Sequence, residues 1–309
     1  MRIVFLGSAE SAFPCLDRIR TGTKDILAGV VTQPDRPKGR SLKTASCAVR
    51  AHLKNISIPI FTPTDINTPE PVRAIRELSP DLIVVVAYGQ ILKSCILEIP
   101  PRGCINVHAS LLPKYRGAAP VQWAVALGDK LTGVTMMYVN EAMDAGDIID
   151  QIEEPIRDDD TDRSLNDRLA QRGADLLTRT LDAIRQGTVH RVPQNNTKAT
   201  FAPKLKKIDG RMDWSKSAKE LNNRIRGFNS RPGCFFKIEG DRSVRVFKAK
   251  LEEGRGVPGT ILDVRGTGPL IQTGNQSLRL LELQPEGRKI MSGSSFLCGY
   301  SMKKDDRLL

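Results

Sequence analysis

The first 190 residues alternate short apolar segments with segments of helical spacing. Runs rich in β-branched residues occur at 2–7, 26–32, 58–61, 81–87 and 104–110, and helical spacing of apolar residues occurs at 71–78, 121–127 and 164–186. Residues 82–87 are apolar on both faces, which is typical of a central parallel strand. Residues 153–162 are acidic and indicate a loop. The alternation predicts a doubly wound α/β domain with a mostly parallel sheet.

The pattern changes after residue 187. Residues 188–205 are polar and lack a clear period, as in a linker between domains. A helical stretch at 218–226 precedes strand-like runs at 235–239, 244–249, 259–264, 270–273 and 278–284. Short strands separated by glycine turns predict a small OB-like β-barrel. We therefore divide the chain into a first domain at 1–187, a linker at 188–205 and a second domain at 206–309.

Composition places the chain among ordinary globular proteins. Its 309 residues are 40% hydrophobic and 27% charged. No apolar run approaches the roughly 18–20 residues that span a membrane, and residues 1–7 lack the pattern of a signal peptide. The six cysteines are scattered without a C-x-x-C pair, which favours free thiols over disulfides or a zinc site. We expect a cytoplasmic monomer with no membrane partner and no metal.

The net charge of +12 is unevenly distributed along the chain. Residues 1–190 contain 23 basic and 23 acidic residues, whereas residues 191–309 contain 24 basic and 12 acidic residues. A basic region joined to a neutral one favours a polyanionic partner, with nucleic acid preferred to a membrane surface. The alternative is a basic surface that only keeps the protein in solution.

The most informative polar pattern lies in residues 104–113. If this segment is a buried strand, Asn106, His108 and Ser110 point to one face, and Pro113 ends the strand. A glycine-bearing loop that contains Asp144 follows. An amide, an imidazole and a carboxylate are the groups needed to attack a carbonyl without a metal. Taken singly, each of these residues is more often structural: a core histidine, an edge asparagine or a turn-capping aspartate.

Several segments together resemble the methionyl-tRNA formyltransferase family over nearly the whole chain. They are residues 32–37, 85–89, 105–113, 115–120, 133–135, 143–148, 212–214, 225–229 and 283–285. The resemblance implies that the formyl group of 10-formyltetrahydrofolate moves to the α-amino group of methionine on initiator Met-tRNA. It assigns the catalytic triad to Asn106, His108 and Asp144. Whether His108 or Asp144 is the general base stays open.

The resemblance also suggests binding residues. Folate contacts fall on Ser110, Leu111, Leu112, Pro113, Tyr88, Gly89 and Ile91. In the proline-punctuated basic segment 33–43, the tRNA candidates are Arg36, Lys38, Arg40 and Lys43. In the basic second domain they are Lys204, Lys206, Lys207, Arg224, Arg226, Arg245 and Lys248.

Two other functions would use some of the same residues. The same triad would serve a formyltransferase acting on a glycinamide ribonucleotide or a nucleotide-sugar amine, although such substrates need no basic domain. A non-catalytic tRNA-binding protein would have no need of the triad. The chain also departs from the family pattern at Gly7-Ser8-Ala9, in residues 41–48 and at Asn229–Pro232, where a tryptophan is usual. None of these departures falls on the triad.

Overall fold

The computed structural model describes residues 1–38 and 43–308. The described residues group into two compact units. Unit 1 comprises residues 1–120, 131–155 and 166–203, and unit 2 comprises residues 121–130, 156–165 and 204–309. Two short internal segments, 121–130 and 156–165, thus belong to the same unit as the C-terminal residues. The predicted domain limits of 1–187 and 206–309 remain a prediction.

Unit 1 is built on a sheet with the strand order β5-β2-β1-β6-β7-β8-β9. Its strands are β1 (Arg2–Gly7), β2 (Ile26–Val31), β5 (Ile60–Phe61), β6 (Leu82–Val86), β7 (Cys104–His108), β8 (Leu131–Tyr138) and β9 (Ile148–Pro155). Pairing is parallel from β5 to β7 and antiparallel from β7 to β9. All five residues of β6 are buried, as their apolar pattern predicts. The predicted α/β fold is confirmed.

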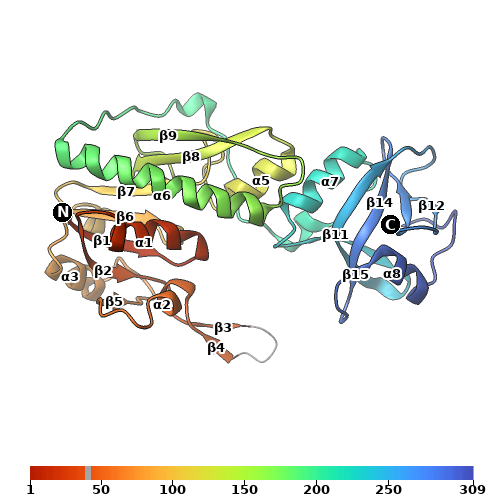
Figure 1. Cartoon of the computed structure of the whole chain (residues 1–309), viewed down its shortest axis with the longest axis horizontal. Coiled ribbons are helices and arrows are strands. Elements are labelled where there is room, and N and C mark those ends of the chain that lie inside the picture. Colours follow the sequence, from red (N-terminus) through yellow and green to blue (C-terminus); the bar gives the residue numbers. More distant parts are fainter. Residues whose placement is uncertain (39–42, 309) are drawn as a thin grey trace. The chain divides into compact units, whose positions relative to one another are not determined.

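Helices border this sheet (Figure 1). They are α1 (Phe13–Gly22), α2 (Ala48–His52), α3 (Pro69–Glu77), α4 (Ser94–Leu97) and α6 (Asp162–Gln186), with the 3-10 turns η1 (Glu10–Ala12) and η2 (Asn196–Lys198). Gly173 shows how closely α6 packs, because a Cβ added there would lie 2.8 Å from Val107 Cγ1 and 3.8 Å from Cys15 Sγ. Helices α1 and α6 therefore cover the same face of β7, and Val107 points toward them.

The acidic segment predicted as a loop at 153–162 is partly strand. β9 extends to Pro155, and Glu154 is only 4% exposed. Arg168 Nε and Arg172 Nε lie 2.6 and 2.9 Å from the carboxylate oxygens of Glu154. Burial raises the pKa of Glu154, but the hydrogen bonds from Arg172 and Arg168 outweigh it and leave the pKa below its usual range.

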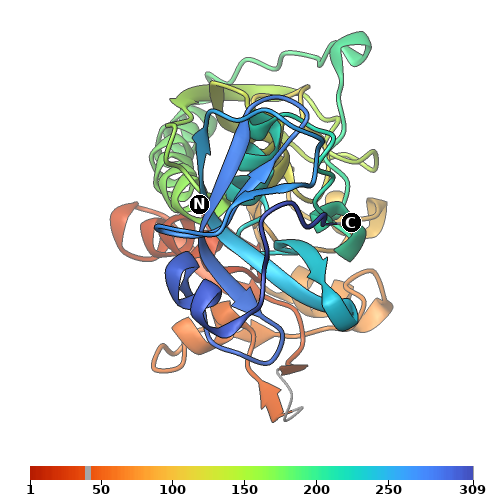
Figure 2. The ribbon, with the colours of Figure 1, turned by 90° about the vertical axis from the view of Figure 1, so that its right-hand side faces the viewer.

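Unit 2 contains an antiparallel sheet with the order β10-β11-β14-β13-β12, and β15 pairs with β14. Its elements are α5 (Pro120–Leu127), η3 (Lys207–Gly210), α7 (Ala218–Gly227), β10 (Cys234–Ile238), η4 (Glu239–Asp241), β11 (Arg242–Glu252), β12 (Ile261–Asp263), β13 (Leu270–Gln272), β14 (Ser277–Pro285), β15 (Met291–Ser292) and α8 (Gly293–Gly299). The long strands β11 and β14 lie side by side in Figure 2. The predicted β-rich C-terminal fold is confirmed.

Local sequence explains how α7 begins and how it packs. Ser217 caps the helix, and its side chain and that of Glu220 form a reciprocal capping box. At the other end, a Cβ added to Gly227 would lie 2.6 Å from Ala126 N. The glycine therefore lets α7 approach α5 within unit 2, beside an edge-on contact between the rings of Trp123 and Phe228.

Candidate active site

Two candidate catalytic side chains stand on one face of β7. Since Val107 points toward α6, its neighbours Asn106 and His108 point to the opposite face of the sheet. His108 is 6% exposed and Asn106 is half-buried. The alternation expected for a buried strand is therefore the one observed, although β7 itself ends at His108.

The carboxylate of Asp144 lies beside both of these side chains. Asn106 Nδ2 is 3.5 Å and His108 Nδ1 is 3.7 Å from Asp144 Oδ1. The other oxygen, Oδ2, accepts a hydrogen bond of 2.9 Å from the backbone N–H of Gly117. An amide and an imidazole from one strand thus meet a carboxylate that follows Asn106 by 38 residues along the chain. Their catalytic roles stay a prediction.

A backbone contact sets the tautomer of His108. Its Nε2 lies 3.0 Å from the carbonyl oxygen of Tyr115, which can only accept a hydrogen bond. Nε2 must therefore carry a proton and donate. In the neutral imidazole the lone pair is then on Nδ1, the nitrogen that faces Asp144. The atom able to take up a proton is the one beside the carboxylate.

The segment 110–113 is held by Thr135 and Gln151, which were not among the predicted site residues. Thr135 Oγ1 donates to the carbonyl of Ser110 at 2.7 Å and accepts from the N–H of Leu112 at 3.0 Å. Gln151 Nε2 donates to the carbonyl of Leu112 at 3.0 Å and to Thr135 Oγ1 at 2.7 Å. Thr135 lies in β8 and Gln151 in β9, so both contacts come from strands distant in sequence from segment 110–113.

The predicted folate residues of this segment differ in access. Ser110 and Leu112 are buried, and the Ser110 hydroxyl donates to the carbonyl of Lys114 at 2.6 Å. Leu111 and Pro113 are half-buried. Leu111 packs closely on β8, since a Cβ added to Gly133 would lie 2.6 Å from its Cδ2. Leu111 and Pro113 are therefore the accessible members of the set.

The three predicted folate residues in the turn after β6 also differ in how accessible they are. Tyr88 is 2% exposed and belongs to a core cluster, so its side chain offers almost no surface to a ligand. Burial raises the pKa of Tyr88 well above its usual range. Gly89 has a φ of 88° with nothing within 4 Å of an added Cβ, and Ile91 is 62% exposed. Gly89 and Ile91 thus offer an open surface.

One departure from the family pattern falls in this area. Ser8 Oγ donates to the carbonyl of Tyr88 at 3.1 Å and accepts from the N–H of Gln33 at the same distance. Gln33 Nε2 donates to the same carbonyl at 3.3 Å. Ser8 therefore ties together the segments that follow β1, β2 and β6.

The proline-punctuated basic segment 33–43 contains paired backbone. The strands β3 (Arg36–Lys38) and β4 (Lys43–Ala45) form an antiparallel ladder. Asp35 anchors the start of β3, since its carboxylate accepts from the N–H of Cys47 at 3.1 Å and pairs with Arg50 at 3.0 Å. Arg40 lies outside the described residues. The predicted tRNA contacts of Arg36, Lys38 and Lys43 remain a prediction.

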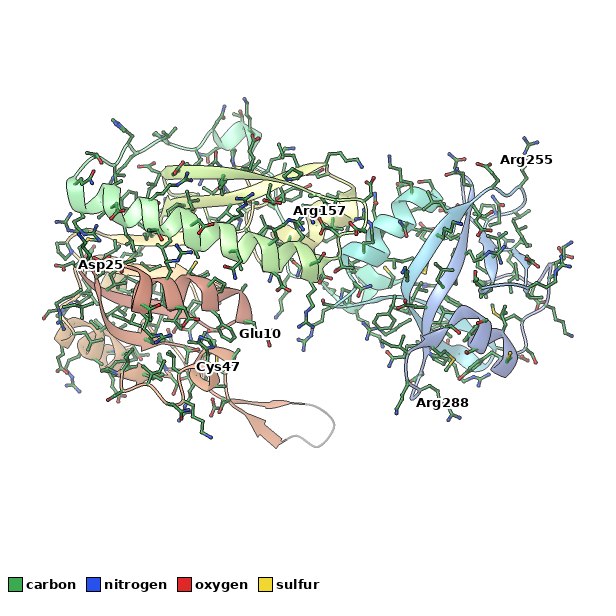
Figure 3. All side chains as sticks on the ribbon, viewed as in Figure 1. Glu10, Asp25, Cys47, Arg157, Arg255 and Arg288 are labelled. Atoms are coloured by element: carbon green, nitrogen blue, oxygen red, sulfur yellow. The ribbon has the colours of Figure 1, made fainter. Side chains whose placement is uncertain are left out.

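The predicted tRNA residues of unit 2 fall into two groups. Lys204, Lys206, Lys207 and Lys248 are exposed, as phosphate contact requires. Arg224, Arg226 and Arg245 are half-buried, so less of each side chain is available to a phosphate, and their tRNA contacts remain a prediction. Their guanidinium groups donate to carbonyl oxygens within unit 2, including those of Asp209, Asp160 and Asn229. Other exposed basic side chains, such as Arg255 and Arg288, also extend from this unit (Figure 3).

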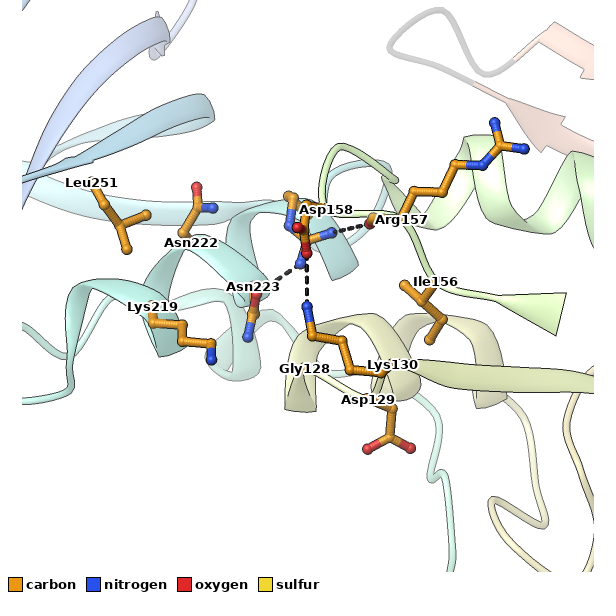
Figure 4. Close-up of a pocket in the computed structure, with 11 residues that line it drawn as sticks. Gly128, Asp129, Lys130, Ile156, Arg157, Asp158, Lys219, Asn222, Asn223 and Leu251 are labelled. Carbon is orange, nitrogen blue, oxygen red and sulfur yellow. Dashed lines mark hydrogen bonds and ion pairs between the residues drawn. The ribbon is translucent and has the colours of Figure 1, made fainter.

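Arg226 lines a cavity of about 190 Å³ in unit 2 (Figure 4). The cavity lies between α7 and the segments 128–130 and 156–158. Arg226 Nη1 donates to the carbonyls of Arg157 and Asp160 at 3.2 and 2.8 Å, and Nη2 donates to Asn223 Oδ1 at 2.7 Å. These bonds join α7 to the segment that precedes α6, so Arg226 already has a structural role.

The described part of the chain offers neither a metal cluster nor a membrane-spanning helix. Over residues 1–38 and 43–308 there is no group of three or more histidine, cysteine, aspartate or glutamate side chains placed to hold a metal ion. Within the same residues, no helix combines the length and apolar character needed to cross a membrane.

Comparison with known families and structures supports the fold. The Formyl transferase family model matches residues 1–181, and the Formyl transferase, C-terminal domain model matches residues 204–301. Among solved structures, WlaRD, a sugar 3N-formyl transferase crystallised with dTDP and 5-N-formyl-THF, has a TM-score of 0.66 at 19% identity, covering 94% of this chain and 99% of its own. HypX from Aquifex aeolicus in complex with tetrahydrofolic acid has a TM-score of 0.63 at 20% identity, covering 96% and 47%. At these identities the likeness shows a shared fold.

Sequence relatives are much more similar. The methionyl-tRNA formyltransferase of Geobacter metallireducens is 42% identical over 308 residues, covering 100% of this chain and 98% of its own length. The enzyme of the same name from Acetivibrio thermocellus is 43% identical over 310 residues, covering 100% and 99%. The resemblance predicted from the motifs is confirmed, and the chain belongs to the methionyl-tRNA formyltransferase family.

Proposed function

We propose that this chain transfers the formyl group of 10-formyltetrahydrofolate to the α-amino group of methionine on initiator Met-tRNA. The observation that carries the proposal is the meeting of Asn106 and His108 with the carboxylate of Asp144, at 3.5 and 3.7 Å. These groups can supply an oxyanion donor and a proton relay, and formyl transfer to an amine requires both. The roles of the individual residues below are part of the proposal.

Asn106 is placed to stabilise the oxyanion. When the amine nitrogen attacks the formyl carbon, a new C–N bond forms and the carbonyl oxygen becomes negative. Asn106 Nδ2 is at 3.5 Å from Asp144 Oδ1, the outer limit of a hydrogen bond, so this N–H is held only weakly in the free protein. It can therefore donate to the oxyanion without giving up a strong contact.

His108 and Asp144 act together on the proton. The attacking amine must lose one proton, and Nδ1 of His108 is the basic atom that faces the site. Asp144 Oδ1 then stabilises the resulting imidazolium. When the tetrahedral intermediate collapses, the bond from carbon to the folate nitrogen breaks and the imidazolium returns the proton to that nitrogen. We thus assign the base to His108 and the supporting charge to Asp144.

The accessible surface beside the site suits a folate-derived donor. Gly89 and Ile91 leave open apolar surface after β6, and Leu111 and Pro113 are half-exposed after β7. In an open α/β sheet, ligands bind beyond the carboxyl ends of such strands. A flat ring system with a polar edge fits apolar side chains flanked by backbone groups.

The basic surface of unit 2 supports a tRNA acceptor. Lys204, Lys206, Lys207 and Lys248 are exposed, and residues 191–309 hold the whole net charge of the chain. Phosphate contacts by such lysines release counterions and make binding depend on salt. A small amine acceptor would gain little from this surface. A cytoplasmic monomer is the form we expect for such an enzyme, and analytical ultracentrifugation would test the monomer.

The test is a formyl-transfer assay with 10-formyltetrahydrofolate and three acceptors in parallel: Met-charged initiator tRNA, glycinamide ribonucleotide and a dTDP-linked aminosugar. We expect formylation of the tRNA alone. Transfer only to a small amine would keep the chemistry of the triad and overturn the tRNA assignment. Transfer to none of the three would overturn the proposed function.

A further inference from the structure

The backbone at Asp144 is held in a conformation that this residue rarely adopts. Its φ is 49°, in the left-handed region that favours glycine. A residue keeps such a conformation only where its surroundings enforce it. The position of the carboxylate beside His108 therefore depends on whatever holds the backbone of the segment 144–146.

One side chain bridges two backbone carbonyls of this segment. Gln194 Nε2 donates to the carbonyl of Asp144 at 2.9 Å and to the carbonyl of Gly146 at 2.7 Å. Gln194 thus uses both N–H groups of its amide on the segment that carries the candidate catalytic carboxylate. It comes from residue 194, in the stretch that the sequence predicted as a linker.

Gln194 is itself fixed by a buried cation. Arg116 is 6% exposed, and its Nε and Nη2 donate to Gln194 Oε1 at 3.0 and 2.7 Å. Nη2 also donates to Asn196 Oδ1 at 2.9 Å. These acceptors are neutral amide oxygens. Burying a guanidinium against neutral acceptors is costly, which argues that the arrangement serves a purpose beyond general stability.

The stretch around Gln194 is bound firmly to unit 1, and we call residues 192–202 the strap. The N–H and carbonyl of Val192 exchange hydrogen bonds of 2.9 Å with those of Ile148 in β9. Thr200 accepts from Tyr115 N through its Oγ1 at 2.9 Å, and its carbonyl accepts from Arg116 N at 2.8 Å. The strap therefore gives Gln194 a fixed backbone on either side.

We propose that Gln194, oriented by Arg116, is a positioning residue that holds Asp144 against His108. Arg116 sets the amide so that its oxygen faces the guanidinium and its nitrogen faces the carbonyls of Asp144 and Gly146. The inference deepens the proposed function and rests on the role assigned there to Asp144. It gives the strap a part in catalysis without contact with substrate.

A purely structural role makes a different prediction, and Gln194→Glu separates the two. A glutamate keeps an oxygen for Arg116 and adds a charge that strengthens that contact. It cannot donate to the carbonyls of Asp144 and Gly146. If Gln194 only fastens the strap through Arg116, the variant should match or exceed the wild type in both stability and turnover.

The experiment measures steady-state formylation of Met-tRNA, thermal unfolding and the KM for 10-formyltetrahydrofolate. Displacing a catalytic group by about 1 Å can cost about 100-fold in rate, so we expect kcat to fall about 100-fold in both Gln194→Glu and Gln194→Met. We expect the KM for the formyl donor and the Tm of Gln194→Glu to stay close to wild type. A wild-type kcat for Gln194→Glu would overturn the proposal.

Asn195→Ala is the matched control in the strap. The Asn195 side chain accepts from the N–H and the hydroxyl of Thr197, at 3.0 and 2.7 Å, and both of these bonds stay within the strap. We expect kcat within about twofold of wild type, because the bonds that Asn195→Ala removes cap the short 3-10 turn η2 and do not reach Asp144 or Gly146. A loss as large as that of Gln194→Met would assign the effect to the strap as a whole and overturn the specific role of Gln194.

A double-mutant cycle separates this inference from the function on which it rests. If Gln194 acts through Asp144, Gln194→Met should change the rate of an Asp144→Ala enzyme by no more than about twofold. If the fold-losses of rate of the two single variants multiply in the double variant, Gln194 does not act through Asp144, and the positioning role is overturned. Wild-type turnover by Asp144→Ala alone would instead overturn the proposed function. Should the Asp144→Ala rate fall below detection, the result for Gln194→Glu decides the matter.

Discussion

The candidate active site of unit 1 and the basic surface of unit 2 use polar side chains in different ways. In the active site, Asn106 and His108 lie 3.5 and 3.7 Å from Asp144, and backbone groups hold the imidazole and the carboxylate. On the basic surface, exposed lysines are spread along the chain from Lys204 to Lys248. The candidate active site should lose most of its turnover when one of these side chains is removed or displaced. The basic surface should lose tRNA affinity gradually as its positive charges are removed one by one.

The largest expected effect is on the oxyanion donor. Replacing Asn106 with alanine should lower kcat by about 10²–10³-fold, the usual cost of losing one such donor. The affinity for Met-tRNA should not change. Rapid-quench measurement of formyl transfer, with filter binding for affinity, checks both. The exposed Asn55 provides the control, since Asn55→Ala should leave both quantities unchanged. A weakened tRNA affinity in Asn106→Ala would contradict the separation of the two regions.

The next largest effect is expected at Gly117, whose backbone N–H holds the carboxylate of Asp144. Gly117 has a φ of 120°, and a Cβ there would lie 2.8 Å from the carbonyl oxygen of Ala202. Gly117→Ala should therefore destabilise unit 1 by more than about 1 kcal/mol and should also lower kcat, because the Gly117 N–H donates to Asp144. Thermal unfolding and turnover measure the two effects.

Gly187→Ala is the control for that substitution. Gly187 also has a positive φ, of 71°, but nothing lies within 4 Å of an added Cβ. It should cost about 1–2 kcal/mol of backbone strain without changing kcat. Equal losses of turnover in the two variants would show that the rate follows general stability rather than the placement of Asp144.

A smaller effect is expected for each charge of the basic surface. Replacing Lys204, Lys206, Lys207 and Lys248 together with glutamine should weaken tRNA binding and flatten its dependence on salt. The slope of log K against log salt should fall by about 1 for each phosphate that a lysine no longer neutralises. The pair Lys24→Gln and Lys54→Gln, two exposed lysines of unit 1, should leave the slope unchanged. An unaltered slope in the fourfold variant would remove these lysines from the tRNA surface.

The last prediction concerns the reactivity of the cysteine thiols, which is expected to leave turnover unchanged. Thiol labelling measures how readily each unit opens to solvent. Burial raises the pKa of Cys15, Cys104 and Cys234 to about 12, so the reactive thiolate is scarce at about pH 8. Cys298 is exposed. A disulfide reagent should label Cys298 quickly, and the three buried thiols only on unfolding. Rapid labelling of Cys104 in the native protein would show that the strand of the active site opens readily.

The sequence predicted those parts of the site that are local in the chain. Asn106 and His108 share a strand, so alternation placed them on one face. Asp144 was noted as a carboxylate on a nearby glycine-bearing loop, but only the family resemblance grouped it with Asn106 and His108, because spacing alone does not bring residues 106 and 144 together. Gln194 escaped prediction altogether. Its partners are backbone carbonyls 48 and 50 residues away, and its polar surroundings are those of a linker.

The fold shows the same limit. The parallel strands β1 and β6 were predicted from apolar runs, whereas β8 and β9 were not singled out. β9 carries Asp150, Glu153 and Glu154, and it lies at the edge of the sheet, where charged side chains are common. Its buried Glu154 depends on arginines of α6, a tertiary contact that no local pattern reveals.

The central claim is that chemistry belongs to the triad and affinity to the basic surface. The most direct test measures, in one experiment, the single-turnover rate at saturating Met-tRNA and the Kd for tRNA, for Asn106→Ala and for the fourfold lysine variant. The account predicts a slow rate with normal Kd for the first, and a normal rate with raised Kd for the second. A change of rate and Kd together in either variant would contradict it.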